Sequence, residues 1–282
     1  MSRPMPRIAV IVPCFNDAAT LEETLDSLDG AEELEIAVAD DGSTGESTIA
    51  LLDRLEREAR PGLTVLRGDE NRGPGSARMR GLAATTSDFV FPLDADDLAV
   101  PGSLTIMADK LDADPTAAAC VADYAEFGFQ DIVRTVPPQL DPFRVAYVNE
   151  YPITALFRRT AIVAAGGWRP VAGYEDWDLW MALAERGEHV VHAGPGVMGY
   201  RRRMHDNRRL GRSKSRHQLL YREMRCAHPG LFAALPEHRR RTTLSPLRRR
   251  LYPLLYGDRK RYGFEITLRR AFDRIGLFPL GR

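Results

Sequence analysis

Three carboxylates stand within four residues, directly after an apolar run with the composition of a buried strand. The run covers residues 89–93, and the acids are Asp94, Asp96 and Asp97. Carboxylates this close repel one another, and Mg²⁺ or Mn²⁺ relieves the repulsion by binding one or two of them together with water and substrate phosphates. In an extended chain Asp94 and Asp96 would share one side, while Asp97 points elsewhere or opens the following turn. The residues predict a metal site for a phosphorylated ligand, with an acidic loop or a helix-start cluster before Pro101 as the alternative.

A glycine loop at residues 71–81 is a second candidate for phosphate binding. It contains Gly73, Pro74 and Gly75 and opens a predicted helix of about ten residues. The start of a helix presents free backbone N–H groups and a positive dipole end, which suit a phosphate. Most such loops only connect elements, so the glycine loop supports phosphate binding only in combination with the neighbouring motifs.

A third group of acids opens a predicted helix at residues 174–187. Glu175, Asp176 and Asp178 fall in its first turn, and Gly187 follows its end, as is typical of a helix. For Asp178 we adopt the structural interpretation, in which the acid complements the helix dipole. Glu175 and Asp176 stand where a glycine-containing loop passes into the helix, which makes them candidates for a chemical role.

Alternating strand and helix patterns position these groups. Apolar runs typical of strands buried in a parallel sheet cover residues 7–13, 35–39, 63–66 and 89–93. Helical patterns separate them, so we predict an α/β fold, with a further strand at residues 153–157 after an irregular excursion at 123–152. In open α/β sheets, ligands bind beyond the carboxyl ends of the strands, where Pro13, Asp41 and Asp94 fall.

The net charge of zero hides an asymmetry along the chain. Residues 1–199 carry 16 basic and 33 acidic residues, whereas residues 200–282 carry 23 and 6. This split predicts a globular body followed by a basic extension directed at an anionic partner. Three widely spaced cysteines argue against a disulfide framework and a zinc site. Without a secretory signal or an apolar run of about 18 residues, we expect a cytoplasmic protein.

In this order and at this spacing, the motifs resemble the inverting family-2 glycosyltransferases of the GT-A fold over about residues 7–210. The motifs that carry the resemblance are Val12-Pro13 with Asn16, Asp40-Asp41-Gly42-Ser43, the loop with Asn71, Gly73, Ala77-Arg78 and Gly81, Asp94-Ala95-Asp96, and Glu175-Asp176. The resemblance implies a mostly parallel sheet flanked by helices. We therefore predict a GT-A catalytic domain at residues 1–210 and a basic, helical C-terminal extension at residues 211–282.

For the donor nucleotide, the resemblance implies that Asp41 reads the base, with Pro13 and Asn16 beside that pocket. Arg78 would lie near the base or the phosphates, and Asp94 would face the ribose or the metal. The donor would be a nucleotide diphosphate sugar, with a UDP-sugar favoured.

For the chemistry, the resemblance implies that Asp96, with Asp94, holds Mg²⁺ or Mn²⁺ on the diphosphate and that Asp176 is the catalytic base. An acceptor hydroxyl has a high pKa, so a carboxylate takes its proton as the oxygen attacks the anomeric carbon. One base suffices for a single displacement with inversion. His205 would belong to a donor-binding loop that begins at Tyr200 and closes over the diphosphate; an exposed residue in a basic run is the equal alternative.

The expected activity is transfer of a sugar to an acceptor hydroxyl in polysaccharide, glycolipid or other cell-envelope glycan synthesis. Two alternatives stay open. A sugar-phosphate nucleotidyltransferase would have a glycine-rich loop with a basic residue directly after the first strand, which residues 13–17 lack. A nucleotide-sugar-binding module without turnover is the other, and Asp176 argues against it.

Residues 201–282 carry four basic triplets and an apolar stripe. The triplets are Arg201-Arg202-Arg203, Arg239-Arg240-Arg241, Arg248-Arg249-Arg250 and Arg259-Lys260-Arg261, and the stripe is Phe264, Leu268, Phe272 and Ile275. This pattern predicts a basic amphipathic helix, for which we weigh two interpretations. The helix binds an anionic surface at the inner face of the membrane, near a glycan or lipid-linked acceptor, or it packs on the acidic catalytic body. Nucleic acid is not an expected partner, because no nucleic-acid-binding motif is present.

Overall fold

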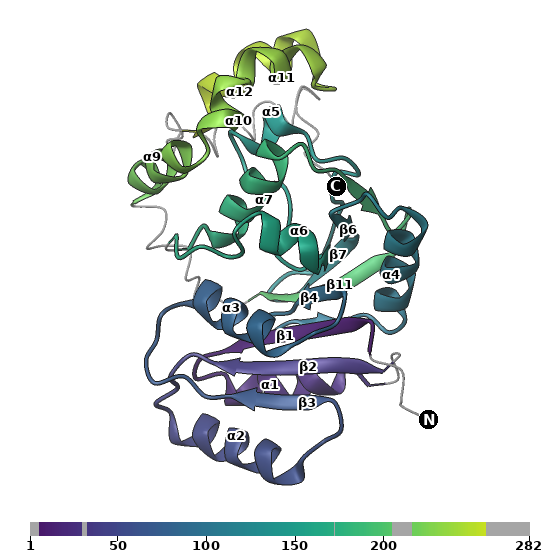
Figure 1. The fold of residues 1–282 in the computed structure, drawn as a ribbon, viewed down its shortest axis with the longest axis vertical. Coiled ribbons are helices and arrows are strands. Elements are labelled where there is room, and N and C mark those ends of the chain that lie inside the picture. The colour runs from purple at the N-terminus through teal and green to yellow at the C-terminus, as the bar shows by residue number, and fades with distance from the viewer. Residues whose placement is uncertain (1–5, 30–32, 172, 205–215, 258–282) are drawn as a thin grey trace.

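A computed structural model describes residues 6–29, 33–171, 173–204 and 216–257, which form two sheets with helices packed around them (Figure 1). The larger sheet has the strand order β10 (Val190–His192), β6 (Ala119–Val121), β9 (Leu156–Arg158), β4 (Phe89–Pro92), β1 (Ile8–Cys14), β2 (Leu34–Asp40) and β3 (Leu63–Leu66). Only β9 runs antiparallel to its neighbours among these described strands. The predicted α/β fold with a mostly parallel sheet is confirmed.

The central strand β1 is buried along its whole length, as its apolar sequence predicts. Ile8 pairs with β2 on one side and with β4 on the other. The strand extends one residue past Pro13, because Cys14 still pairs with Asp40 of β2, whereas the pairing with β4 already ends at Ile11. Pro13 has no N–H to donate, and it lies beyond the part of β1 that pairs with β4.

Helices cover the sheets and extend the molecule at both ends. They are α1 (Ala18–Asp26), α2 (Glu46–Glu58), α3 (Pro74–Ala84), α4 (Ser103–Ala113), α5 (Pro142–Val145), α6 (Arg159–Ala164), α7 (Glu175–Glu185), α9 (His217–Ala227), α10 (Pro229–Ala233), α11 (Leu235–Arg241) and α12 (Pro246–Leu255). In Figure 1, α1 and α2 lie with β1, β2 and β3 at one end, and α11 and α12 lie at the other. α7 lies between these two ends.

The glycine loop is followed by α3, which two glycines hold close to its neighbours. A Cβ on Gly81 would lie 2.4 Å from Cγ2 of Ile11, so a larger residue would push the helix away from β1. In the first turn, a Cβ on Gly75 would lie 3.3 Å from both Cβ of Glu175 and the carbonyl oxygen of Trp168. α3 therefore packs closely against α7 at its start and against β1 near its end.

The smaller sheet has the order β5 (Leu98–Ala99), β11 (Met198–Met204), β7 (Asp123–Gly128) and β8 (Ile132–Arg134). Tyr200 and Arg201, which we expected in a loop over the diphosphate, lie instead in β11 and pair with β5 and β7. Tyr200 is buried and stacks on Tyr124 at a ring-centroid distance of 4.9 Å. The predictions for His205 and for the amphipathic helix at 264–275 lie outside the described residues.

The segment at 123–157 matches the prediction in part. The hairpin β7–β8 and the short helix α5 occupy the expected irregular excursion. The strand that follows begins at Leu156, three residues later than predicted, and is antiparallel. Its two neighbours explain the late start, because β4 and β6 pair only with residues 156–158.

Helices α9 to α12 occupy the described part of the predicted extension, residues 216–257, and α9 shares a core with α7. Leu220, Tyr221 and Met224 of α9 belong to the same buried cluster as Trp177 and Trp180. The division of the chain into domains at residue 210 stays a prediction. In the described part of the chain, no helix combines the length and the apolar character that crossing a bilayer would require.

Candidate active site

The three predicted carboxylates meet at the carboxyl end of β4. One oxygen from each of Asp94, Asp96 and Asp97 lies within 4.8 Å of the other two. The residues form a turn, in which the N–H of Asp97 donates to the carbonyl oxygen of Asp94 at 3.0 Å. Of our two expectations for Asp97, the one in which it points elsewhere was therefore wrong, because it assumed an extended chain.

Asp97 is the buried member of this acidic turn, with 4% of its surface exposed. It accepts a hydrogen bond from the N–H of Arg203 in β11 at 2.8 Å. Burial, together with the charges of Asp94 and Asp96, raises the pKa of Asp97 well above its usual value. Three carboxylate oxygens are the donor set that Mg²⁺ or Mn²⁺ prefers, and a bound cation would favour the ionised form of each acid. The residues present therefore fit the implied metal.

Arg78 joins the acidic turn to α7. Its guanidinium donates to Oδ1 of Asp94 at 2.6 Å and to Oε1 of Glu175 at 3.2 Å. Burial alone would lower the pKa of Arg78, but the charges of Asp94 and Glu175 outweigh it and raise that pKa. Only 2% of Arg78 is exposed, so its first role in this structure is to connect the two acidic segments. Its contact with a donor stays a prediction.

Asp176 lies at the start of α7 with both carboxylate oxygens engaged. Oδ1 accepts from the N–H of Trp177 at 2.7 Å, and Oδ2 accepts from the side-chain amide of Asn149 at 2.8 Å. Burial and then the charge of Glu175 raise the pKa of Asp176 to about 7, although part of the residue remains accessible to solvent. A carboxylate of this kind is suited to exchange protons near neutral pH.

Asp41 directly follows β2 and accepts hydrogen bonds from the glycine loop. Its oxygens accept from the N–H of Arg72 at 3.2 Å and from the N–H of Gly73 at 2.7 Å. The next residue, Gly42, has a φ of +73°, and a Cβ there would lie 2.7 Å from the backbone of Glu70. A carboxylate has about four lone-pair positions, so Asp41 keeps capacity for a further donor.

Asn16 connects the loop after β1 to the start of α2. Its side-chain oxygen accepts from the N–H groups of Thr44 and Gly45 at 3.0 and 2.8 Å. Its backbone has a φ of +60°, which asparagine tolerates better than most residues. Pro13, buried at the end of β1, stands just before this loop. These residues fix the loops beside the sheet edge, and their contacts with a base stay predictions.

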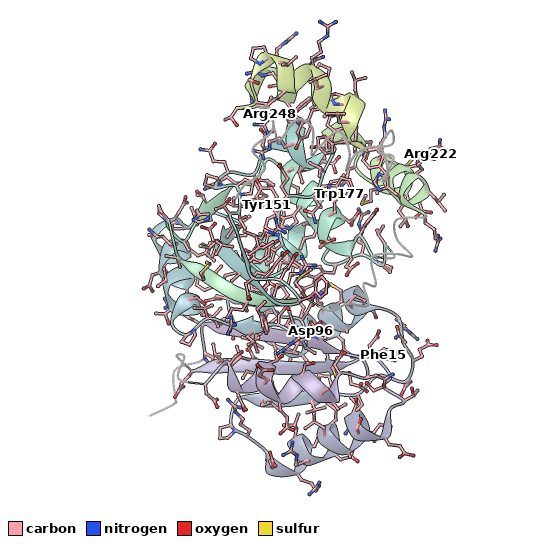
Figure 2. The ribbon with its side chains drawn as sticks, turned by 180° about the vertical axis from the view of Figure 1, so that it is seen from behind. Phe15, Asp96, Tyr151, Trp177, Arg222 and Arg248 are labelled. Atoms are coloured by element: carbon pink, nitrogen blue, oxygen red, sulfur yellow. The ribbon has the colours of Figure 1, made fainter. Side chains whose placement is uncertain are left out.

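Figure 2 shows the site along the long axis of the molecule, with Phe15 and Asp96 toward the N-terminal half, Trp177 beyond them and Arg248 at the far end. Two residues of the site were missed from the sequence. Asn149 lies in the irregular excursion, where no motif marks it. Arg203, read only as part of a basic triplet, donates from Nε to the carbonyl oxygen of Asp96 at 3.0 Å. Both contacts cross the fold, so local sequence carries no signal for them.

Comparison with known proteins identifies the family. The family model for glycosyl transferase family 2 matches residues 9–171, more than half of the chain. An uncharacterized glycosyltransferase of Haemophilus influenzae is 28% identical over 154 residues, which are 52% of this chain and 57% of that protein. The GalNAc(5)-diNAcBac-PP-undecaprenol beta-1,3-glucosyltransferase of Campylobacter jejuni is 32% identical over 108 residues, 38% of this chain and 35% of that protein. The chain thus spans about half the length of these relatives, or less.

Two solved structures share the fold. S. aureus TarS 1–349 in complex with UDP-GlcNAc matches with a TM-score of 0.65 and 16% identity, over 96% of this chain and 79% of that one. The mannosyltransferase PcManGT from Pyrobaculum calidifontis, in complex with GDP-Man and Mn²⁺, matches with a TM-score of 0.57 and 21% identity, over 97% and 81%. The likeness confirms the GT-A fold. With the family match across β1, α3 and the acidic turn, it follows that this chain belongs to glycosyltransferase family 2.

Proposed function

We propose that this chain transfers a sugar from a nucleotide diphosphate sugar to an acceptor hydroxyl, with inversion at the anomeric carbon. The observation that carries the proposal is the bridge made by Arg78. It joins the acidic turn at Asp94 to Glu175, the neighbour of Asp176. One site therefore combines oxygen ligands for a divalent cation with a carboxylate that titrates near neutrality.

Asp94, Asp96 and Asp97 would hold Mg²⁺ or Mn²⁺ beside the donor diphosphate. When bound, the cation offsets the charge that develops on the departing nucleoside diphosphate. The Mn²⁺ named with PcManGT supports this assignment. Arg203 holds the same turn through the carbonyl oxygen of Asp96 and the carboxylate of Asp97, so β11 helps to fix the geometry of the metal ligands.

Asp176 would take the proton of the acceptor hydroxyl. Asn149 and the N–H of Trp177 orient its carboxylate, and the remaining lone pairs can accept from an incoming hydroxyl. This arrangement supports a single displacement. It also argues against the binding module without turnover, because a module of that kind would not need a carboxylate whose pKa is near 7.

The donor we propose is a UDP-sugar, and the acceptor is a glycan or a lipid-linked saccharide of the cell envelope. TarS is named with UDP-GlcNAc, PcManGT with GDP-Man, and the Campylobacter relative with an undecaprenol diphosphate acceptor. The buried Asp41 and the adjoining Pro13 and Asn16 would shape the base pocket at the strand ends. Arg78 would lie beside the donor phosphates.

A panel of nucleotide sugars tests the proposal. Each is incubated with the protein and Mn²⁺, and hydrolysis and thermal shift are measured with and without chelator, since a ligand that binds the folded state raises its stability. We expect one donor to release its nucleoside diphosphate in a metal-dependent reaction. Binding of a donor without turnover would favour the binding module, and exchange of pyrophosphate would favour the nucleotidyltransferase.

The rate of transfer should fall on the acidic side of about pH 7. Burial and the charge of Glu175 raise the pKa of Asp176 to about 7, so below that pH the base carries a proton and cannot accept another. We expect kcat/KM to fall about tenfold for each pH unit below this point. The affinity for UDP in the presence of Mn²⁺, measured over the same range, serves as the control. A fall in both kcat/KM and the affinity for UDP would show that the titrating groups are the metal ligands and not Asp176.

We also propose that the extension attaches the protein to an anionic membrane surface. Arg239, Arg240 and Arg250 are exposed, and the ion pairs of the described residues include none of them. On α12, Leu247 and Leu254 are about half exposed and lie on the same face as Arg250. Exposed leucine beside arginine on one helix face is typical of a helix that lies in a membrane interface.

Sedimentation with lipid vesicles tests this attachment. Reversing one basic charge near an anionic surface removes about 2 kcal/mol, since each contributes about 1 kcal/mol. We therefore expect Arg250→Glu to weaken pelleting with anionic vesicles about 30-fold at low salt. Arg57→Glu, an exposed arginine on α2 at the opposite end, is the matched control and should pellet like the wild type. Equal pelleting with neutral and anionic vesicles, or with neither, would reject the proposal.

A further inference from the structure

The first residue of α9 holds the start of α7. His217 Nδ1 lies 2.8 Å from the hydroxyl of Tyr174, the residue directly before α7, and His217 Nε2 lies 2.8 Å from the carbonyl oxygen of Gly257. A carbonyl oxygen can only accept, so Nε2 donates and the Tyr174 hydroxyl can donate to Nδ1. Both side chains are buried. This contact fixes the chain two residues before Asp176.

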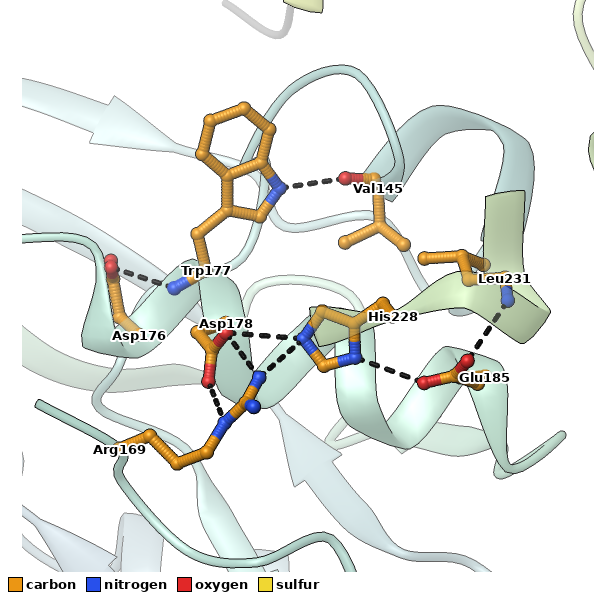
Figure 3. A network of polar contacts seen from close by, with 8 residues as sticks. All are labelled: Val145, Arg169, Asp176, Trp177, Asp178, Glu185, His228 and Leu231. Carbon is orange, nitrogen blue, oxygen red and sulfur yellow. Dashed lines mark hydrogen bonds and ion pairs between the residues drawn. The ribbon is translucent and has the colours of Figure 1, made fainter. Parts of the chain in front are cut away.

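A second contact fixes α7 on the other side of Asp176. His228, just before α10, is 2% exposed, and its Nε2 lies 3.1 Å from Oδ1 of Asp178 (Figure 3). Its Nδ1 lies 3.0 Å from Oε2 of Glu185, whose other oxygen accepts the N–H groups at the start of α10. Arg169 donates to both oxygens of Asp178 at 2.7 and 2.5 Å. The fully buried Asp178 is therefore the centre of a charged network between α7 and α10.

The same helices hold the loop that carries Asn149. Trp177 Nε1 donates to the carbonyl oxygen of Val145 at 2.6 Å, as Figure 3 shows, and the hydroxyl of Tyr221 in α9 donates to that of Ala146 at 2.8 Å. The rings of Trp177 and Tyr221 contact each other at a centroid distance of 5.7 Å. The chain runs from Ala146 to Asn149, which donates to Asp176. Both partners of the Asp176 carboxylate are therefore fixed by α7 and α9.

We propose that α9 and α10 form part of the catalytic unit and that His217 and His228 are positioning residues for Asp176. The inference rests on the proposed role of Asp176 as the base. A base acts only within hydrogen-bond reach of the proton it removes, and a displacement of about 1 Å can cost about 100-fold in rate. The family match ends at residue 171, so α7 and both histidines lie beyond it.

Two variants loosen the contacts without removing an acidic group. Tyr174→Phe deletes one hydroxyl and keeps the ring against Trp177. His228→Gln replaces the imidazole with an amide, a polar group that cannot contact Asp178 and Glu185 together. Leu219→Ala, at a half-exposed position of α9, is the matched surface control. Leu55→Ala, in the core beneath α2, is the control for a general loss of stability.

Three measurements separate positioning from stability. We expect Tyr174→Phe and His228→Gln to lower the rate of donor hydrolysis about tenfold or more, to leave the affinity for UDP with Mn²⁺ unchanged, and to increase hydrogen exchange in residues 174–186. Leu219→Ala and Leu55→Ala should leave hydrolysis and exchange in that segment at wild-type values. The inference is overturned if both variants keep wild-type hydrolysis and exchange, or if Leu55→Ala reproduces their effects. If the wild type hydrolyses no nucleotide sugar, the proposed function fails, while hydrogen exchange still decides whether α9 and α10 hold α7.

Discussion

Replacing Asp176 with asparagine is expected to lower the rate of transfer about 1,000-fold, because the amide keeps the shape of the side chain but cannot accept the acceptor's proton. The side-chain oxygen of the asparagine can keep the hydrogen bond from the N–H of Trp177, and the Asn149 amide can turn over so that its oxygen accepts from the new NH2 group. The affinity for UDP with Mn²⁺ should not change. Single-turnover kinetics with the donor from the panel measure the first quantity, and calorimetry measures the second.

The same variant should be more stable than the wild type at neutral pH. The pKa of Asp176 is raised to about 7 in the folded protein, above its unfolded value, so the folded state holds the proton more tightly. Stability therefore falls as the pH rises from about 4 to about 7, and above about pH 7 the folded protein bears the full free-energy cost of the ionised Asp176. We expect Asp176→Asn to gain on the order of 2 kcal/mol at about pH 8 and nothing at about pH 4.

Asp178→Asn provides the matched comparison two residues further along α7. Asp178 is fully buried and paired with Arg169 and His228, so its replacement should destabilise the protein. Urea unfolding at about pH 8 measures both variants. Wild-type turnover in Asp176→Asn, or a loss of stability equal to that of Asp178→Asn, would contradict the assignment of Asp176 as the base.

The framework of this site could be predicted from the sequence because it depends on patterns of adjacent residues. The apolar run of β1 and the acids after β4 each follow from adjacent residues, and the rule that parallel strands end at one sheet edge brings Asp41 and Asp94 to the same end. Glycines at positions 75 and 81 are also visible in sequence, although only the structure shows that they let α3 approach Glu175 and Ile11. The roles themselves came from the resemblance, which depends on the order of the motifs.

Contacts between distant segments could not be predicted from the sequence. Asn149 donates to Asp176 across 27 positions, and Arg203 reaches Asp96 across 107. Neither contact leaves a periodic or compositional pattern. The approach of Asp97 to the other two acids was not predicted, because the strand pattern was extended past Leu93, where the hydrogen bond between Asp97 and Asp94 bends the chain. The structural interpretation of Asp178 agrees with its buried pairing, and α10 supplies a partner that the local pattern could not reveal.

Replacing Asp96 with asparagine is expected to weaken metal-dependent binding of UDP about 100-fold. A hard cation binds charged carboxylate oxygens far better than an amide, and the cation carries most of the attraction for the diphosphate. Asp94 is already paired with Arg78, and Asp97 with the N–H of Arg203. The family resemblance places Asp96 on the cation, so its replacement tests the metal site directly. Titration of UDP at several Mn²⁺ concentrations measures the change.

Asp88→Asn is the matched control, because Asp88 is an exposed acid directly before β4, at the opposite end of the strand. It should bind UDP and Mn²⁺ like the wild type. Asp96→Asn should need more Mn²⁺ to reach half-saturation, and excess Mn²⁺ should restore part of the UDP affinity, because the remaining two carboxylates still offer oxygen ligands. If Asp96→Asn binds UDP with wild-type affinity and chelator has no effect on either protein, the metal is not held at this turn, and the acids there act only by capping the end of β4.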